Sequence, residues 1–370
     1  MTWEVIARPR RQTFNAATAG YFAKGCHHMR RRDLLGAGLG LLSVSALSGC
    51  AGQRGAHDSA SGGAAAPRGA APREATAVSA SAWAAARRHA DTSFGKIAYV
   101  ERGDGPCALF LHGFPLNGFQ WRGAIDRLSA HRRCVAPDFL ALGYSEVRTG
   151  QSVALDAQAA MLAALLDTLR IGSADIVAND SGGAVAQLFV ARHPERVRTL
   201  LLTNCDTEPD SPPPAVLPVI RMARAGTFAD QLLAAWLADK TLARSDKGLG
   251  GLTYTYRTHP TDEALECYLG PLVSSPERKA LVHAYAMALA PNPLAGLEPA
   301  LRRCAAPTRI VWGTGDDIFS AASPAYLDRT CGNSRGVRTV AEAKLFWPEE
   351  FPEIIAEEAR RLWDVGPSVA

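Results

Sequence analysis

The segment 174–193 constrains the fold more than any other part of this 370-residue chain. Residues 174–179 predict a short buried strand, and residues 184–193 have the apolar periodicity of a helix. Only the sequence Asp-Ser-Gly-Gly at 180–183 lies between them, so the chain must pass from strand to helix in a tight turn. Such a turn is strained, and small residues allow the helix to pack close to the strand.

The turn also has the small-x-nucleophile-x-small pattern of a nucleophile elbow, here Ala178-Asn179-Asp180-Ser181-Gly182. The central position holds the carboxylate of Asp180, which predicts attack on an electrophilic carbon rather than ordinary serine esterase chemistry. A register shifted by one residue makes Ser181 the nucleophile but places the larger Asn179 at a small position. A strand-to-helix turn without chemistry is a third interpretation, because Gly-Gly turns are common.

From about residue 92 the predicted strands and helices alternate, which indicates the α/β class with a mostly parallel sheet between helices. The alternation stops over 207–296, where a proline run and several helix-like segments predict an inserted helical cap. Residues 91–206 and 297–366 then form one core domain. The predicted strands are 97–100, 107–111, 134–137, 174–179, 199–203 and 309–312, and the predicted helices are 153–170, 184–193 and 349–363.

The N-terminal segment resembles a bacterial export signal. The twin arginine Arg31-Arg32 precedes an apolar run of about 14 residues that closes with Leu-Ser-Gly-Cys50. This run is too short to span a bilayer. The motif resembles a lipobox, so we expect lipidation of Cys50 and attachment to the periplasmic face of a membrane, most simply the outer membrane.

Residues 1–50 are accordingly expected to be an N-terminal extension and signal peptide, with Met29 as the true start. Residues 51–90 are dominated by Ala, Gly, Ser and Pro, which predicts a disordered linker because such a segment lacks the apolar bulk for a core.

Charge and cysteine usage exclude some functions. The net charge is only +4, and no basic face with interleaved aromatic residues favours nucleic-acid binding. The six cysteines after Cys50 have no metal-binding spacing, and export would permit a disulfide without selecting a pair. We expect no metal and no cofactor. Cys107, Cys134 and Cys205 lie in apolar strand-like runs and are expected in the core.

Six motifs carry a family resemblance over residues 92–365. They occur in the order and spacing of the α/β-hydrolase superfamily, and they resemble its epoxide hydrolase and haloalkane dehalogenase branch, which uses an aspartate nucleophile. The motifs are His112-Gly113-Phe114-Pro115, Trp121-Arg122, Ala136-Pro137-Asp138 with Gly143-Tyr144-Ser145, Asn179 to Gly183, His193 to Val197, and Trp312 to Asp317.

The resemblance implies a role for each site residue. Asp180 would attack an sp³ carbon to form an alkyl-enzyme ester, and the backbone N–H groups of Phe114 and Ser181 would form the oxyanion hole. His112 would hold the backbone of its loop, and Gly113 and Trp121 belong to the supporting motifs. Asp316 matches the family's acid position. Asp317 and Asp206 stay open as alternatives for that acid.

The chain departs from the family at the general base. An ungapped match through Pro352-Glu353 places Leu345 where the family has histidine, and no histidine follows His283. General-base catalysis contributes roughly 10²–10⁴-fold, so its loss should slow hydrolysis of the ester more than its formation. The candidate substitutes are Glu349, Glu350, His259 and His283.

The resemblance also bears on the substrate. Dehalogenases place halide-binding residues where this chain has Phe114 and Ser181, so halide stabilisation should be weak. Epoxide hydrolases use cap tyrosines as proton donors, for which Tyr254, Tyr256, Tyr268 and Tyr285 are candidates. We therefore expect a hydrolase of a small apolar epoxide, haloalkane or ester-like substrate. The alternatives are a single-turnover or binding protein and a serine esterase that uses Ser181.

Overall fold

The computed structural model describes residues 78–366. These residues form a nine-stranded sheet. Its first two strands along the chain pair antiparallel with their neighbours, and the other strands of the main path run parallel to one another. In spatial order the strands are β1 (Arg87–Thr92), β2 (Gly95–Arg102), β4 (Arg133–Pro137), β3 (Cys107–Leu111), β6 (Ala174–Asp180), β7 (Val197–Cys205), β8 (Thr308–Gly313) and β9 (Ser334–Val340), and β5 (Glu146–Val147) pairs with β2.

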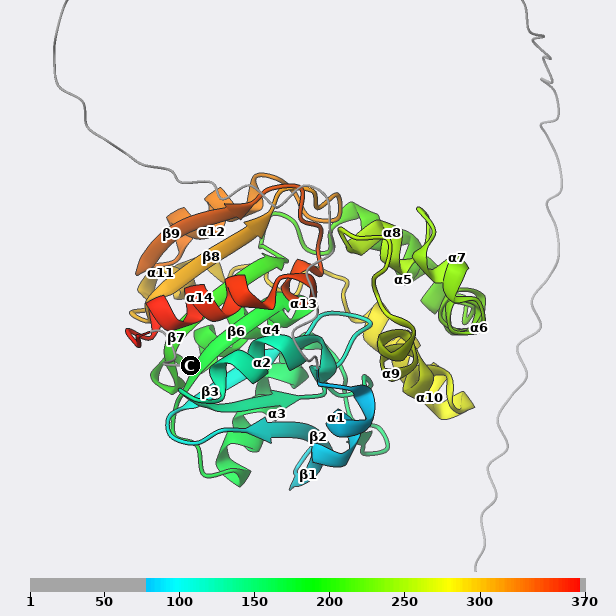
Figure 1. Ribbon diagram of the computed structural model, residues 1–370, viewed down its shortest axis with the longest axis horizontal. Helices are drawn as coiled ribbons and strands as arrows, with labels where there is room; N and C mark the ends of the chain where they lie inside the picture. Colours follow the sequence, from blue (N-terminus) through cyan, green and yellow to red (C-terminus); the bar gives the residue numbers. More distant parts are fainter. Residues whose placement is uncertain (1–77, 367–370) are drawn as a thin grey trace, which may run out of the picture. The chain divides into compact units, whose positions relative to one another are not determined.

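Helices cover both faces of this sheet, as expected for a mostly parallel sheet (Figure 1). On one face lie α2 (Arg122–Leu128), α13 (Trp347–Glu350) and α14 (Pro352–Leu362), and on the other lie α3 (Leu155–Thr168), α4 (Ser181–Arg192), α11 (Glu298–Arg303) and α12 (Ser323–Thr330). The short helices η1 (Gly118–Trp121) and η2 (Pro194–Arg196) complete the connections. The predicted α/β-hydrolase architecture is therefore confirmed.

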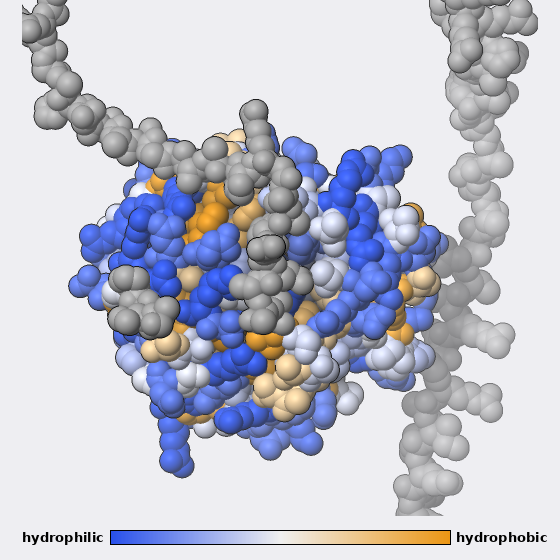
Figure 2. Space-filling view, in the orientation of Figure 1, coloured by the Kyte–Doolittle hydropathy of each residue, from blue (hydrophilic) through white to orange (hydrophobic). Residues whose placement is uncertain are grey.

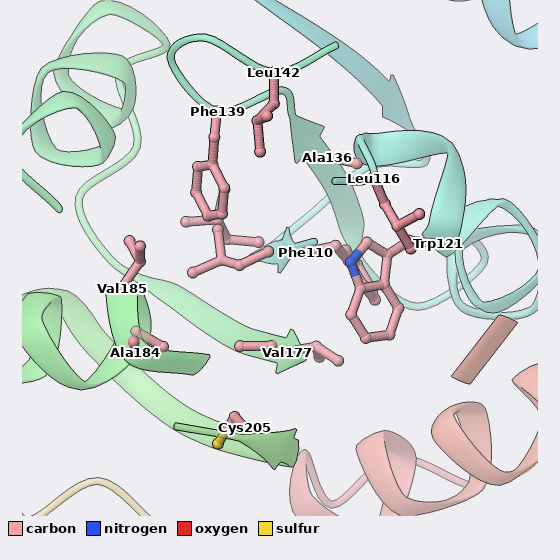
Figure 3. Packing of buried hydrophobic residues seen from close by; sticks show 14 of the residues in the cluster. Phe110, Leu116, Trp121, Ala136, Phe139, Leu142, Val177, Ala184, Val185 and Cys205 are labelled. Atoms are coloured by element: carbon pink, nitrogen blue, oxygen red, sulfur yellow. The ribbon is translucent and has the colours of Figure 1, made fainter. Parts of the chain in front are cut away.

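The central strands are apolar because both of their faces are covered. Every residue of β3 and of β6 is buried. Figure 3 shows Phe110, Val177 and Cys205, which come from the neighbouring strands β3, β6 and β7, among the packed core side chains. The six cysteines in the described residues are all buried and free, including the three expected in the core.

The segment 207–296, called the cap below, is helical, and in Figure 1 its helices gather beside the sheet. Its elements are η3 (Pro214–Val216), α5 (Leu217–Arg224), the π-helical turn η4 (Ala229–Ala234), α6 (Ala235–Ala238), α7 (Lys240–Arg244), α8 (Leu249–Thr253), α9 (Asp262–Val273) and α10 (Pro276–Met287).

The last residues of the linker expected over 51–90 fall in described secondary structure. Helix α1 (Ala80–Ala86) buries Trp83, whose ring contacts Phe119 edge-on at 5.8 Å. Strand β1 follows directly and pairs antiparallel with β2. The expectation was wrong for these residues. The segment is rich in alanine, and its average composition does not reveal the single buried Trp83 or the mostly polar edge strand β1.

Two further differences lie near the C-terminus. The sequence analysis did not predict β9, which is the edge strand of the sheet and only partly buried, so its apolar pattern is weak. The helix predicted over 349–363 is two helices, α13 and α14, which separate at Phe351. Pro352 follows the break, and proline has no N–H to continue a helix from the preceding turn.

The expected signal peptide, Met29, Cys50 and most of the expected linker lie outside the described residues. Within 78–366, no helix has the length and apolar character needed to cross a membrane. The part of the surface visible in Figure 2 is mainly hydrophilic, with smaller hydrophobic areas between. The large apolar side chains that are exposed in the described region are Leu217, Leu242 and Leu252.

Candidate active site

The strand-to-helix turn has a strained backbone and leaves no space for larger side chains. Asp180 ends β6 with φ 55° and ψ −133°, a conformation that non-glycine residues rarely adopt, and α4 begins at the next residue. A Cβ atom at Gly182 would lie 2.5 Å from the carbonyl oxygen of His112, and one at Gly183 would lie 2.3 Å from Cβ of Cys205. Glycine is therefore needed at both positions for α4 to approach β3 and β7.

Backbone N–H groups hold the Asp180 carboxylate. The Phe114 N–H donates to Asp180 Oδ1 at 2.7 Å. Burial raises the pKa of Asp180, and hydrogen bonds from the backbone of Ser181 and of Phe114 act in the opposite direction. These are the two backbone donors that the sequence resemblance assigns to the oxyanion hole, and both point at the same side chain.

The loop that carries Phe114 is supported from below by His112 and Gln120. The buried His112 ring bonds Gly113 O through Nδ1 at 2.9 Å and accepts the Phe139 N–H at Nε2 at 3.0 Å. Burial lowers the pKa of His112 to about 4, so the ring is neutral at neutral pH. Both ring nitrogens are hydrogen-bonded to the backbone, so neither is free to exchange a proton with a substrate or with Asp180.

Three buried amide side chains that the sequence analysis missed connect the site. Gln120 accepts the Gly113 N–H at 3.0 Å and donates to Asn179 Oδ1 at 2.7 Å. Asn179 in turn donates to the carbonyl oxygen of Leu345 at 3.1 Å. The third, Asn204, donates to Asp316 at 2.8 Å. Their sequence signal is an amide inside or beside an otherwise apolar strand, where burial demands hydrogen-bond partners.

A mostly apolar cavity of about 130 Å³ opens in front of Asp180. Core and cap both contribute to its wall. The polar residues of this wall are Asp180, Ser181, Asp206 and Thr253, and its apolar residues are Phe114, Pro115, Pro212, Pro213, Ala215, Val216, Val219, Phe228, Trp236, Leu249, Leu252, Leu289, Ile318, Phe319 and Leu345. Thr253 donates its hydroxyl to Leu249 O, so it is engaged within its own helix.

Leu345 forms part of this wall, and Asp316, at the family acid position, does not. The Leu345 side chain is buried against the same cavity as Asp180. Asp316 accepts the Ile318 N–H and the Asn204 amide, each at 2.8 Å, and burial raises the pKa of Asp316 to about 6. Asp317 is exposed. No histidine lines the cavity in the described part of the chain, so Asp316 has none to orient there.

The two glutamates considered as substitute bases are engaged elsewhere. Glu349 accepts Arg122 Nη1 at 2.8 Å and the Tyr254 hydroxyl at 2.6 Å. Glu350 accepts two cap backbone N–H groups, at 2.9 and 2.8 Å, and burial raises its pKa to about 7. Neither glutamate lines the cavity. Both carboxylates tie α13 to its surroundings instead of facing Asp180.

The two cap histidines are also outside the cavity wall. His259 lies 3.9 Å from Glu350 and stacks on Tyr254. His283 accepts the Ala229 N–H at 3.0 Å through Nε2. Neither position brings an imidazole to the Asp180 side chain.

One of the four cap tyrosines reaches the elbow. Tyr285 hydrogen-bonds Ser181 through its hydroxyl at 3.1 Å, and its ring stacks on Phe114 with 5.2 Å between the ring centroids. Tyr254 and Tyr268 lie beside Glu349. None of these tyrosines is among the residues that line the cavity. In this arrangement no tyrosine hydroxyl in the described residues forms part of the cavity wall.

Asp206 is the second carboxyl group of the cavity wall. It follows Cys205, which is the register partner of Asp180 across β6 and β7. The Ser211 hydroxyl donates to Asp206 Oδ1 at 2.8 Å. Burial, and then the charge of Asp180, raise the pKa of Asp206 to about 8. The wall thus pairs an acid that keeps its proton at neutral pH with the carboxylate at the elbow.

A model of the alpha/beta hydrolase fold matches residues 109–344, and the chain belongs to that family. Among its relatives, haloalkane dehalogenase 2 of Mycobacterium bovis is 35% identical over 114 residues, which are 31% of this chain and 40% of that protein. Epoxide hydrolase 3 of Mus musculus is 28% identical over 240 residues, which are 60% of this chain and 61% of that protein.

The solved structure of the epoxide hydrolase CorEH is similar in fold. It superposes with a TM-score of 0.63 at 20% identity and covers 75% of this chain and 98% of its own. The chain spans less than two thirds of the length of the curated relatives it matches.

Proposed function

We propose that this protein hydrolyses a small apolar electrophile through an ester formed on Asp180. The observation that carries the proposal is the Asp180 carboxylate, which is held through Oδ1 by the Phe114 N–H at the wall of an apolar cavity. One carboxylate oxygen would attack an sp³ carbon and displace its leaving group. Water adds to the ester carbon in a second step, and the oxyanion forms where the N–H groups of Phe114 and Ser181 converge.

Cavity size and lining limit the substrate. A dry apolar cavity of roughly 150 Å³ is known to hold benzene, and the cavity here is about 130 Å³. Its wall supplies few polar groups, so a substrate with one reactive polar centre and a hydrocarbon remainder matches it best. The relation to a haloalkane dehalogenase and an epoxide hydrolase supports the same choice of substrate.

Two other functions fit the site less well. A serine esterase would need a base beside Ser181, whose hydroxyl bonds Tyr285 while no histidine lines the cavity in the described residues. A protein that forms the ester once and stops is favoured by one observation, the leucine at position 345 in the cavity wall. In such a single-turnover protein the Asp180 ester would persist and accumulate, whereas a hydrolase would release the product.

The test of this proposal is a single turnover with styrene oxide in heavy-oxygen water, followed by peptide mass analysis. Because water attacks the ester carbon, we expect one heavy oxygen in the peptide that contains Asp180 and an unlabelled diol in that first turnover. Label only in the diol would contradict an Asp180 ester. A persistent adduct on Asp180 without diol would identify the single-turnover protein.

We also propose that the protein is exported and attached to a membrane by lipid on Cys50, as the sequence motif indicates. The described domain would then act outside the cytoplasm, at the end of the segment between Cys50 and residue 78. Expression in a bacterial host with labelled palmitate should label the wild-type chain and place it in the membrane fraction. A Cys50→Ser variant should lose both. Equal labelling of the two chains would refute lipidation at this residue.

A further inference from the structure

We propose that Asp206 performs both proton transfers of the reaction, first as the acid for the leaving oxygen and then as the base for water. It would thereby replace the absent histidine and the cap tyrosines, and the substrate class would be epoxides, whose departing oxygen needs a proton. This inference rests on the proposed role of Asp180.

Two carboxyl groups of the described residues line the cavity. Asp180 and Asp206 are the titratable side chains among its lining residues in the described part of the chain. The groups considered above as substitute bases, and the tyrosines considered as acids, lie outside the wall. Asp206 is thus the carboxylic acid in the wall, besides the proposed nucleophile, that can carry a proton to or from a molecule in the cavity.

Asp206 is surrounded by charged groups that favour its neutral form. It is 5% exposed, and Asp180 and Asp210 are the charged groups that act on it. Both are negative and favour its neutral form, whereas the hydroxyl of Ser211 favours its ionised form. Tyr285 and Cys205 are also titratable and nearby, and both stay neutral because burial raises the pKa of each. We therefore assign the resting pair one proton, on Asp206, and assign the carboxylate form to Asp180, which accepts the Phe114 N–H.

The first step consumes that proton. Asp180 attacks one carbon of the epoxide ring, the bond from that carbon to the ring oxygen breaks, and the oxygen takes the proton of Asp206. The products are a hydroxyalkyl ester on Asp180 and a carboxylate on Asp206. Ester formation also removes the negative charge of Asp180, which had raised the pKa of Asp206. Burial, the larger cause, remains, so the Asp206 carboxylate is a stronger base than an exposed aspartate, although its pKa is lower than in the resting state.

The second step restores the resting state. The Asp206 carboxylate takes a proton from water as the water oxygen bonds to the ester carbon, and the oxyanion forms at the N–H groups of Phe114 and Ser181. When the ester bond breaks, the departing alkoxide takes that proton from Asp206. Asp180 is left as a carboxylic acid, and its proton passes to Asp206. The two aspartates hold one proton before and after the cycle.

The proposal predicts a substrate-dependent effect of Asp206→Asn. With styrene oxide, both ester formation and hydrolysis should slow, and turnover should fall by roughly 10²-fold or more. With 1-bromobutane, halide leaves without a proton, so the ester should form at the wild-type rate and then accumulate, which intact mass analysis detects. Asp317→Asn changes an exposed neighbour of the family acid position and should behave as wild type with both compounds.

The pH profile supplies an independent measurement. For the wild type, kcat/KM with styrene oxide should fall as the pH rises through about 8, where Asp206 loses its proton. Ser211→Ala removes a hydroxyl that lowers the pKa of Asp206, so this limb should move to higher pH. This variant leaves both carboxyl groups in place and keeps the proposal testable even if Asp206→Asn fails to fold.

Three results separate the possible failures. Wild-type turnover of styrene oxide by Asp206→Asn, with heavy oxygen still entering Asp180, would overturn this inference and leave the proposed function intact. Equal slowing of ester formation with both compounds would also overturn it, because it would show a positioning role without proton transfer. An unlabelled Asp180 in the wild type would overturn the proposed function itself.

Discussion

Replacement of Asp180 by asparagine is expected to abolish turnover and to make the protein more stable. Loss of the proposed nucleophile should reduce kcat by roughly 10⁴-fold or more, because removal of one covalent catalytic group costs about as much as removal of its whole set. The amide is similar in shape and can still accept the Phe114 N–H, so the elbow should keep its geometry. It also removes a buried charge that the fold solvates poorly.

The direction of the stability effect follows from the pKa of Asp180. Burial raises the folded pKa above the unfolded one, so the folded state keeps its proton to higher pH. Unfolding then releases a proton, and this carboxyl group lowers stability progressively as pH rises through its folded pKa. The gain in Tm of Asp180→Asn over wild type should accordingly grow from acidic toward neutral pH.

The measurements are turnover of an epoxide and thermal unfolding at several pH values. Asp317→Asn is the matched control, because it removes the same charge from an exposed position and should change neither quantity. If Asp180→Asn kept wild-type turnover, the nucleophile would lie elsewhere, and Ser181 would be the first residue to replace.

The second large effect is expected at the ion pair between Arg122 and Glu349. Arg122 Nη1 lies 2.8 Å from Glu349 Oε1, and the two side chains are 8% and 1% exposed. An Arg122→Met variant would leave the carboxylate buried without its cation, which typically costs about 3–5 kcal/mol. The guanidinium also lies over the Phe119 ring at 4.1 Å, and the methionine would keep part of that packing. Chemical denaturation at constant pH measures the loss.

A double variant, Arg122→Met with Glu349→Gln, tests the physical cause. It removes both charges and keeps an acceptor for the Tyr254 hydroxyl, so it should recover most of the lost stability. A double variant no more stable than the single one would show that the loss came from packing around Arg122 instead of from an unpaired carboxylate.

The same ion pair shows why one hypothesis about the base could not be settled from the sequence. Glu349 lies four residues after Leu345 and was a reasonable substitute on proximity along the chain. In the structure it turns to Arg122 and Tyr254, which come from distant segments. Asp206 appeared only as a third candidate for the acid partner, and its position at the cavity wall became visible through the register of β6 and β7.

The sequence alone determined the fold class, the order of the main strands and helices, and the tight turn that carries Asp180, because these depend on local periodicity and on glycines that permit close backbone approach. Only the tertiary structure decided which carboxyl groups share a cavity and which are neutralised by an arginine. Those choices depend on burial and on the charge of neighbours far away in the chain. Two aspartates that are 26 positions apart therefore line one cavity, while a glutamate four positions after Leu345 does not.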